Sequence, residues 1–264
     1  MENYAELNRQ SWNKRTDAHF NSDFYDNKSF IKGRNSLNDI EIQYLKEIRG
    51  KSVLHLQCHF GQDTISLNRL GASRVVGVDL SDHAIEKARI LAETCGSTAE
   101  FICCNVYDLP QNLEEQFYYI FTSYGTIGWL PDLDLWAQIV SKFLKSGGKF
   151  VFAEFHPVVW MMDEQFETIK YRYFQSEPII EENTGSYTDG SENLAITDVS
   201  WNHGLAEVIS SLLNQGLKLK DFKEYDYSPY DCFSNTVEVE KGKFRIKHLD
   251  DKIPMVYSLL MEKY

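Results

Sequence analysis

The sequence lacks the features that direct a chain out of the cytosol or into a membrane. Its first residues, 1–15 (MENYAELNRQSWNKR), are polar and have no apolar core of the kind that a signal peptide needs. The most apolar stretch, Phe150–Met162, is interrupted by Glu154, His156 and Pro157 and is too short to span a bilayer. We therefore expect a cytoplasmic protein with no membrane partner.

Basic residues and paired cysteines are also scarce. The chain has 27 lysines and arginines against 39 acidic residues, which gives a formal net charge of -12. This balance repels phosphate backbones, so nucleic acid is not an expected partner. The five cysteines include no CxxC pair, and no metal site is expected. Their odd number and apolar surroundings predict buried, reduced thiols.

Apolar residues are abundant, and their pattern predicts an α/β fold. With 43% hydrophobic and 14% aromatic residues, the chain can form a full core, which argues against disorder. Short β-branched runs alternate with amphipathic stretches, which is typical of a doubly wound, mostly parallel sheet with helices on both faces. Ligands of such sheets bind at the carboxyl ends of the strands. The expected strands are Ser52–Leu56, Arg74–Asp79, Phe101–Cys104, Tyr118–Ser123 and Lys149–Phe155, and the expected helices are about Asp63–Leu70, one capped by Ser81, and Asp132–Leu144.

After Phe155 the alternation stops. Residues 156–193 form a long acidic and aromatic stretch with the Gly-rich patch TGSYTDGS, and residues 227–251 form a second irregular stretch. We interpret both as insertions at one edge of the sheet that cover a site. Regular structure is expected again in a helix at about Gly204–Gln215, a strand near residues 218–226 and a final strand at Met255–Met261.

Three strand ends carry residues suited to a nucleotide-like ligand. The first strand runs into VLHLQCHFG, where Gly61 opens the next helix and lets backbone amides approach a ligand, although a plain strand-to-helix connection is the simpler alternative. Asp79 ends the second strand and can accept hydrogen bonds from ribose hydroxyls. Its alternative role as a helix cap is already filled by Ser81. Asn105 can bond an adenine edge beside an apolar wall at Val106, although asparagine is common in loops.

Taken together, the motifs resemble those of the class I S-adenosylmethionine-dependent methyltransferases, and especially a subgroup with an LQCHFG first motif. The similarity is strong over about residues 51–155 and weaker toward the C-terminus through WNHGLAEVISSLLNQGL. The motifs, in order, are VLHLQCHFGQDT, VVGVDLS, NVYDLP, FTSYGTIGWLPD, LKSGGKF and EFHP.

This resemblance implies a Rossmann-like, seven-stranded sheet whose last strand is antiparallel, with S-adenosyl-L-methionine across the ends of the first four strands. His55 stands where most of the superfamily has a carboxylate, and a neutral imidazole cannot pair with the amino group of the cofactor as a carboxylate would. Gln57 can offer an amide oxygen instead. The implied cofactor residues are His55, Gln57 and Gly61 at the methionine part, Asp79 and Leu80 at the ribose and adenine, Asn105 and Val106 at the adenine, and Ser123 at the start of the fourth motif.

The resemblance divides the chain into an N-terminal helical lid segment, residues 1–50, and a methyltransferase domain, residues 51–264. The lid interpretation depends on Trp12, His19 and Tyr25, and a surface helix with aromatic anchors is the alternative. We expect residues 156–193 to form a cap that sets acceptor specificity, with a glycine hinge at Gly185–Gly190. An ordered decoration remote from the site is the alternative for this segment.

The implied activity is methyl transfer to a small molecule. A general base is needed only if the acceptor must lose a proton, and the candidates are Tyr124, Glu154, His156 and His203. His156 ranks first because it follows the fifth strand and begins the insertion. A nicotinamide-dependent oxidoreductase would need a GxGxxG turn, which QCHFGQ does not provide. A module that binds the cofactor without transfer stays open, and the sequence predicts neither the acceptor atom nor the oligomeric state.

Overall fold

The computed structural model describes residues 3–174, 176–191 and 193–264. Its centre is a seven-stranded sheet in the order β3-β2-β1-β4-β5-β11-β8. Strand β11 runs antiparallel to both of its neighbours, and the other adjacent pairs are parallel. The predicted α/β class and mostly parallel seven-stranded sheet are thus confirmed. The strands are β1 (Ser52–Leu56), β2 (Arg74–Asp79), β3 (Glu100–Cys103), β4 (Phe117–Ser123), β5 (Leu144–Phe155), β8 (Leu217–Tyr225) and β11 (Val256–Lys263).

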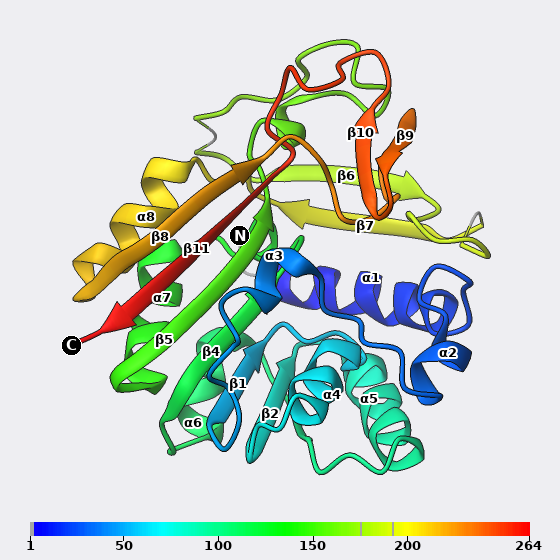
Figure 1. The fold of residues 1–264 in the computed structure, drawn as a ribbon. Coiled ribbons are helices and arrows are strands. Elements are labelled where there is room, and N and C mark those ends of the chain that lie inside the picture. Colours follow the sequence, from blue (N-terminus) through cyan, green and yellow to red (C-terminus); the bar gives the residue numbers. More distant parts are fainter. Residues whose placement is uncertain (1–2, 175, 192) are drawn as a thin grey trace.

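Helices cover both faces of the sheet (Figure 1). Side chains alternate between the two faces of a strand, so Leu54 and Leu56 of β1 join the core beneath α7 and α8, whereas Val53 joins the core on the α4 side. Ser81 caps α5 by accepting a hydrogen bond from the Ala84 N–H at 3.0 Å, as predicted. The long helices of this part are α4 (Gln62–Arg69), α5 (Asp82–Thr94), α7 (Leu133–Phe143) and α8 (Leu205–Asn214), with a short α6 (Leu109–Asn112).

The end of α7 differs from the prediction. The helix stops at Phe143, and β5 begins at once at Leu144. The sequence Ser146-Gly147-Gly148, which was expected to end the helix, lies inside β5 at an irregularity in its pairing with β4. Glycine allows the strand to bulge there before its buried half pairs in register, and Ser146 and Gly147 are exposed.

The segments outside the sheet gather at the carboxyl ends of the parallel strands. Figure 1 shows α1 lying between these strand ends and two β-hairpins. The first hairpin begins within the insertion at residues 156–193 and ends beyond it at Ser200; residues 175 and 192 lie outside the described residues. The elements are α1 (Tyr4–His19), α2 (Asn27–Ile31), α3 (Asp39–Ile42), the hairpin of β6 (Ile179–Thr184) and β7 (Ala195–Ser200), the hairpin of β9 (Thr236–Glu240) and β10 (Lys243–Ile246), and the short 3-10 helices η1 (Val106–Asp108), η2 (Ile127–Trp129) and η3 (Val159–Met161).

The cysteines are free, but the prediction that they are buried is wrong for most of them. Cys58 is buried, whereas Cys103 is exposed and the other three are partly exposed. Strand β3 is at the edge of the sheet, so Cys103 has no further strand beside it. In the described ranges, no helix has both the length and the apolar character needed to cross a membrane.

Candidate active site

A cavity of about 960 Å³ lies where the parallel strands end. This volume is at the upper end of the range for small-molecule sites, roughly 300–1,000 Å³. Its wall brings together all the side chains that the sequence assigned to the cofactor. They are His55, Gln57, Gly61, Asp79, Leu80, Asn105, Val106 and Ser123.

Asp79 lines the cavity at the carboxyl end of β2. One carboxylate oxygen accepts the Ser81 N–H at 2.9 Å, and the other accepts the His59 N–H at 2.8 Å. Burial raises the pKa of Asp79 to about 6, although these backbone N–H groups act in the opposite direction. A carboxylate has about four acceptor positions, so two backbone bonds leave room for ribose hydroxyls.

The turn after β1 has an unusual backbone that brings it close to the cavity. Gln57 and His59 have φ values of 55° and 49°, and Gly61 has a φ of 80°. A left-handed conformation is uncommon for residues other than glycine. A Cβ atom added at Gly61 would lie 2.6 Å from Cε1 of Phe101, so both the backbone angle and the packing require glycine at this one position.

Gln57 supplies a buried acceptor without a partner. Its amide nitrogen donates to the Thr126 carbonyl oxygen at 2.7 Å, and because a carbonyl only accepts, the orientation of the amide is determined. The Gln57 Oε1 atom is buried and has no hydrogen-bond partner in the described part of the chain. Such an atom is costly unless a donor satisfies it, and the ammonium group of a bound methionine moiety is a donor of the required kind.

His55 lies deeper than Gln57. It is 2% exposed, and its Nδ1 is 2.8 Å from the Thr64 hydroxyl. Burial lowers the pKa of His55 to about 3, so the ring is neutral. This position therefore offers no charge to a ligand.

Asn105, Val106 and Ser123 also line the cavity. Asn105 caps η1 by accepting the Tyr107 N–H at 3.0 Å, which leaves its amide N–H groups to donate to the nearby Tyr4 hydroxyl or to a ligand. Val106 is buried beside it. The Ser123 hydroxyl donates to Asp63 at 3.3 Å.

His156, the predicted catalytic residue, does not line the cavity. It reaches across β11 to Glu224 of β8, with Nε2 at 3.0 Å from the carboxylate, and its Nδ1 accepts the Val158 N–H at 3.2 Å. Burial lowers its pKa, and Glu224 only partly offsets this. One ring nitrogen is thus engaged by the outer strand β8 and the other by the backbone that follows β5, which does not support catalysis by this residue.

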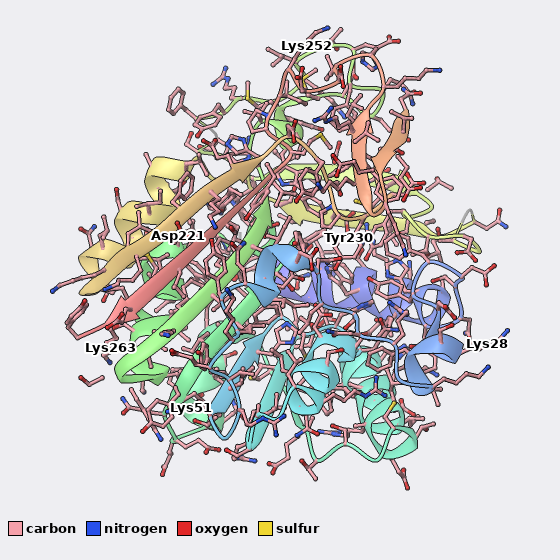
Figure 2. All side chains as sticks on the ribbon, in the orientation of Figure 1. Lys28, Lys51, Asp221, Tyr230, Lys252 and Lys263 are labelled. Atoms are coloured by element: carbon pink, nitrogen blue, oxygen red, sulfur yellow. The ribbon has the colours of Figure 1, made fainter. Side chains whose placement is uncertain are left out.

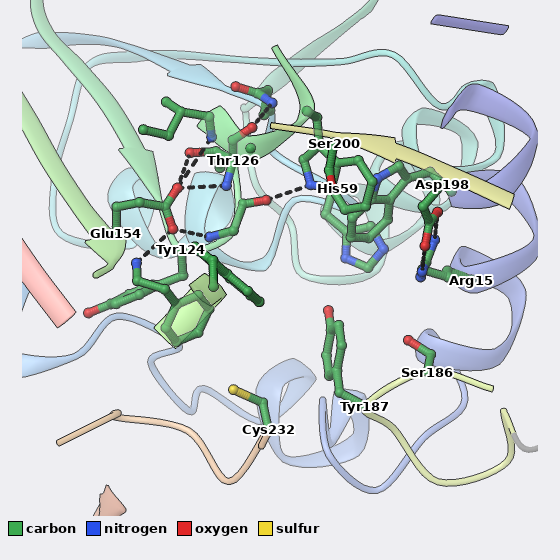
Figure 3. Close-up of a pocket in the computed structure, with 18 of the residues that line it drawn as sticks. Arg15, His59, Tyr124, Thr126, Glu154, Ser186, Tyr187, Asp198, Ser200 and Cys232 are labelled. Carbon is green, nitrogen blue, oxygen red and sulfur yellow. Dashed lines mark hydrogen bonds and ion pairs between the residues drawn. The ribbon is translucent and has the colours of Figure 1, made fainter. Parts of the chain in front are cut away.

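Two other candidate bases have structural partners. Glu154 is buried and accepts the backbone N–H groups of Thr126 at 2.7 Å and Phe155 at 2.7 Å, and it also bonds the Gly125 N–H (Figure 3). It therefore holds the turn after β4 in place. His203 bonds the Leu130 carbonyl oxygen at 2.8 Å through Nε2.

The N-terminal helix and the hairpin of the insertion close over the cavity together. Arg15 of α1 and Asp198 of β7 form a buried pair with two hydrogen bonds, of 2.8 and 2.6 Å, visible at the side of the cavity in Figure 3. The Asn8 side chain exchanges two hydrogen bonds with the Val199 backbone, of 2.8 and 2.9 Å. Residues 3–19 and the β6–β7 hairpin thus form one continuous cover.

Sequence reasoning missed several residues of this site. Asp63, in the first turn of α4, is next to Ser123, and burial raises its pKa. Arg34 lines the cavity and, among the described residues, forms no ion pair there, unlike Arg15 and Lys170. Asp63 follows the QCHFGQ motif directly, but Arg34 lies in a segment with no motif.

The comparisons with known proteins match this geometry. The family model for a methyltransferase domain matches residues 48–203, which is more than half of the chain. The chain belongs to this methyltransferase family. Membership of this family argues against the nicotinamide-dependent alternative.

Solved structures share the fold of this methyltransferase. An S-adenosylmethionine-dependent methyltransferase from Mesorhizobium loti has a TM-score of 0.57 and 17% identity, covering 88% of this chain and 100% of that one. Geranyl diphosphate C-methyltransferase from Streptomyces coelicolor A3(2), in complex with Mg²⁺, geranyl diphosphate and S-adenosyl-L-homocysteine, has a TM-score of 0.57 and 15% identity, covering 86% and 78%. At these identities the likeness concerns the fold alone.

Curated relatives match part of the methyltransferase. A ubiquinone biosynthesis O-methyltransferase of Neisseria meningitidis is 25% identical over 134 residues, which are 49% of this chain and 56% of that protein. An uncharacterized protein of Haemophilus influenzae is 25% identical over 154 residues, which are 52% and 60% of the two chains. The chain thus spans about 60% or less of the length of these relatives.

Proposed function

We propose that this enzyme transfers the methyl group of S-adenosyl-L-methionine to a small molecule enclosed between the strand ends and the cover. The observation that carries the proposal is the cavity whose wall joins the cofactor residues to the inner side of the insertion. The predicted lid, residues 1–50, and cap, residues 156–193, are proposed to act as one closure through the Arg15–Asp198 pair.

Several features of this chain fit the cofactor. Asp79 has free acceptor positions for the ribose hydroxyls, and Asn105 has amide donors for the adenine. The unpaired Oε1 of Gln57 is suited to the amino group. We assign Arg34 to the carboxylate, because it is the lining cation without an ion pair in the described structure. When bound, the cofactor supplies a methyl group activated by its sulfonium.

The protein contributes alignment and the exclusion of water. The cover encloses the acceptor. Beneath it, an apolar wall is formed by Phe155, Trp160 and Phe233, whose ring centroids lie 5.0–5.9 Å apart. Acidic side chains outnumber basic ones among the described residues that line the cavity. Both features support a small acceptor and argue against nucleic acid.

Replacement of Asp79 by alanine tests the cofactor assignment. Loss of charge-assisted bonds to the ribose is expected to weaken S-adenosyl-L-methionine binding by about 1.5–3 kcal/mol, measured by calorimetry. Asp82→Ala is the matched control, because Asp82 is exposed and bonds Arg9 and Asn13 instead. Equal affinity in the Asp79 variant and the wild type would reject Asp79 as the ribose ligand.

A further inference from the structure

Tyr124 stands at the boundary between the cofactor residues and the aromatic wall of the cavity. It follows β4 directly, with a left-handed φ of 46°, and its N–H donates to the Ala153 carbonyl oxygen at 2.7 Å. Its ring lies 5.6 Å from that of Phe155 and 5.2 Å from that of Tyr230, centroid to centroid. A left-handed conformation away from glycine is uncommon, and here it places a phenol beside the expected path of the acceptor.

The Tyr124 hydroxyl leads to a buried carboxyl group. It donates to Oε2 of Glu41 at 2.8 Å, and Glu41 is fully buried in α3. The other oxygen, Oε1, accepts the Asn38 backbone N–H at 2.8 Å and the Asn38 side-chain amide at 3.2 Å. Within residues 3–174, 176–191 and 193–264, no basic side chain forms an ion pair with Glu41. Buried carboxyl groups without a cation are rare, and this one ends a chain of hydrogen bonds that starts in the cavity.

Tyr230 completes the arrangement from the opposite side. Its hydroxyl accepts the Asn38 side-chain amide at 2.8 Å, so the Tyr230 proton is free to be donated. Figure 2 shows Tyr230 between the strand ends and the hairpins, away from the lysines labelled at the periphery. Because Tyr124 gives its proton to Glu41, its oxygen presents lone pairs to the cavity. One phenol is therefore set to accept a proton and the other to donate one.

We propose that Tyr124 and Glu41 take up the proton of a hydroxyl group on an aromatic acceptor. Tyr124 is the catalytic residue that contacts the acceptor, and Glu41 is the positioning residue that receives the Tyr124 proton. The acceptor O–H proton moves to the Tyr124 oxygen while the Tyr124 proton moves to Oε2 of Glu41. The freed oxygen lone pair forms the bond to the methyl carbon as the carbon–sulfur bond breaks, and that electron pair stays on sulfur.

This inference rests on the proposed function and names its acceptor class. A neutral amine attacks with its own lone pair and needs no base beforehand, whereas a hydroxyl becomes a much stronger nucleophile when it loses its proton. The aromatic wall supports a ring-bearing acceptor, since aromatic pairs prefer centroid separations of about 4.5–7 Å. An acceptor that enters neutral also avoids the repulsion of the acidic lining.

The pair has a defined pH response. Burial, together with the charge of Asp63, raises the pKa of Glu41 to about 8, while its bonds from Asn38 and Tyr124 act against this. The titratable groups that face Glu41 are Asp63 of α4, Tyr124 after β4 and Tyr230 after β8. From β5, the packing side chains Ala153 and Phe155 are apolar. Glu41 can accept a proton only when ionised, so the transfer rate should rise with pH through about 8.

The test uses Tyr124→Phe and Glu41→Gln with Tyr119→Phe as the control, because Tyr119 is buried in β4, the strand that precedes Tyr124, and does not line the cavity. With a panel of simple phenols and labelled S-adenosyl-L-methionine, Tyr124→Phe should lower kcat about 100-fold or more with little change in KM. Glu41→Gln should abolish the rise of the rate near pH 8. Tyr119→Phe should behave as the wild type.

A spectroscopic readout is independent of turnover. 4-Nitrophenol bound with S-adenosyl-L-homocysteine should show more phenolate absorbance in the wild type than free in solution at the same pH, and Tyr124→Phe should remove this excess. Three results would each overturn the proton-transfer role while leaving methyl transfer intact. They are an unchanged kcat and pH profile in Tyr124→Phe, no phenolate excess in the wild type, and transfer to amines alone. If the wild type transfers to no small molecule at all, the proposed function itself fails. Equal affinity for S-adenosyl-L-homocysteine among the variants shows that they fold.

Discussion

Replacing Asp198 by alanine should reduce the free energy of unfolding by about 3–5 kcal/mol, because it leaves the Arg15 guanidinium buried without a counter-ion. Asp198 is 5% exposed and Arg15 is 7% exposed. Burial alone would raise the pKa of Asp198, but the hydrogen bonds and charge of Arg15 outweigh this and leave the pKa below its ordinary value. The Arg15 guanidinium also lies over the Trp12 and Trp129 rings, at 5.3 and 5.8 Å.

The loss of unfolding free energy depends on which partner of the Arg15–Asp198 pair remains. The double variant Arg15→Leu/Asp198→Leu should recover most of the loss, since apolar replacement of a buried ion pair is often neutral or stabilising. The matched control is Glu115→Ala, which breaks a partly exposed pair with Arg74. An exposed pair contributes about 0–1 kcal/mol, so this variant should be close to the wild type.

Urea denaturation followed by circular dichroism measures these differences, and hydrogen exchange of residues 4–19 shows whether α1 detaches first. In Asp198→Ala, the amide hydrogens of α1 should exchange faster than in the wild type, while those of the sheet stay protected. A loss below about 1 kcal/mol, equal to that of the exposed control, would refute the view that this pair holds the cover in place.

Two further predictions concern single buried positions. Since the pKa of Glu41 is about 8 when folded against its ordinary value of 4.5, folding favours the protonated form, and wild-type stability should fall as pH rises from about 4.5 to 8. Melting curves of Glu41→Gln and the wild type should therefore show that the stability of the variant relative to the wild type is higher at pH 9 than at pH 5. An equal difference between the two proteins at both pH values would contradict the raised pKa of Glu41. Gly61→Ala should cost about 1–3 kcal/mol more in urea denaturation than Gly96→Ala, because both positions have a positive φ but only Gly61 would collide with Phe101. Equal losses would show that backbone strain alone matters.

The strands β1 and β2 are well predicted from sequence because they are buried on both faces. Strands Ser52–Leu56 and Arg74–Asp79 occur in the structure with the predicted bounds, since β-branched runs between turn residues have few alternatives. The residues at their carboxyl ends then meet by topology, which explains why the predicted cofactor residues all line one cavity.

The contact that joins the two parts of the cover and the Tyr124–Glu41 pair are not visible in the sequence. Arg15 and Asp198 are 183 residues apart, and no local pattern links them. Glu41 lies in a four-residue helix, and nothing nearby indicates that it becomes buried against Tyr124. The position of His156 after β5 favours a catalytic role, but side-chain direction depends on the neighbouring strands, and the His156 ring points toward β8.

The most direct test of methyl transfer to an enclosed small molecule is to find which fraction receives the label. The enzyme is incubated with methyl-labelled S-adenosyl-L-methionine, a metabolite extract, tRNA and protein. We predict label in the small-molecule fraction with the wild type. A variant with residues 156–193 replaced by a short Gly-Ser linker should still bind the cofactor in calorimetry but should transfer no label. Efficient labelling of tRNA or protein with metabolites inert, or full turnover without the cap, would contradict methyl transfer to an enclosed small molecule.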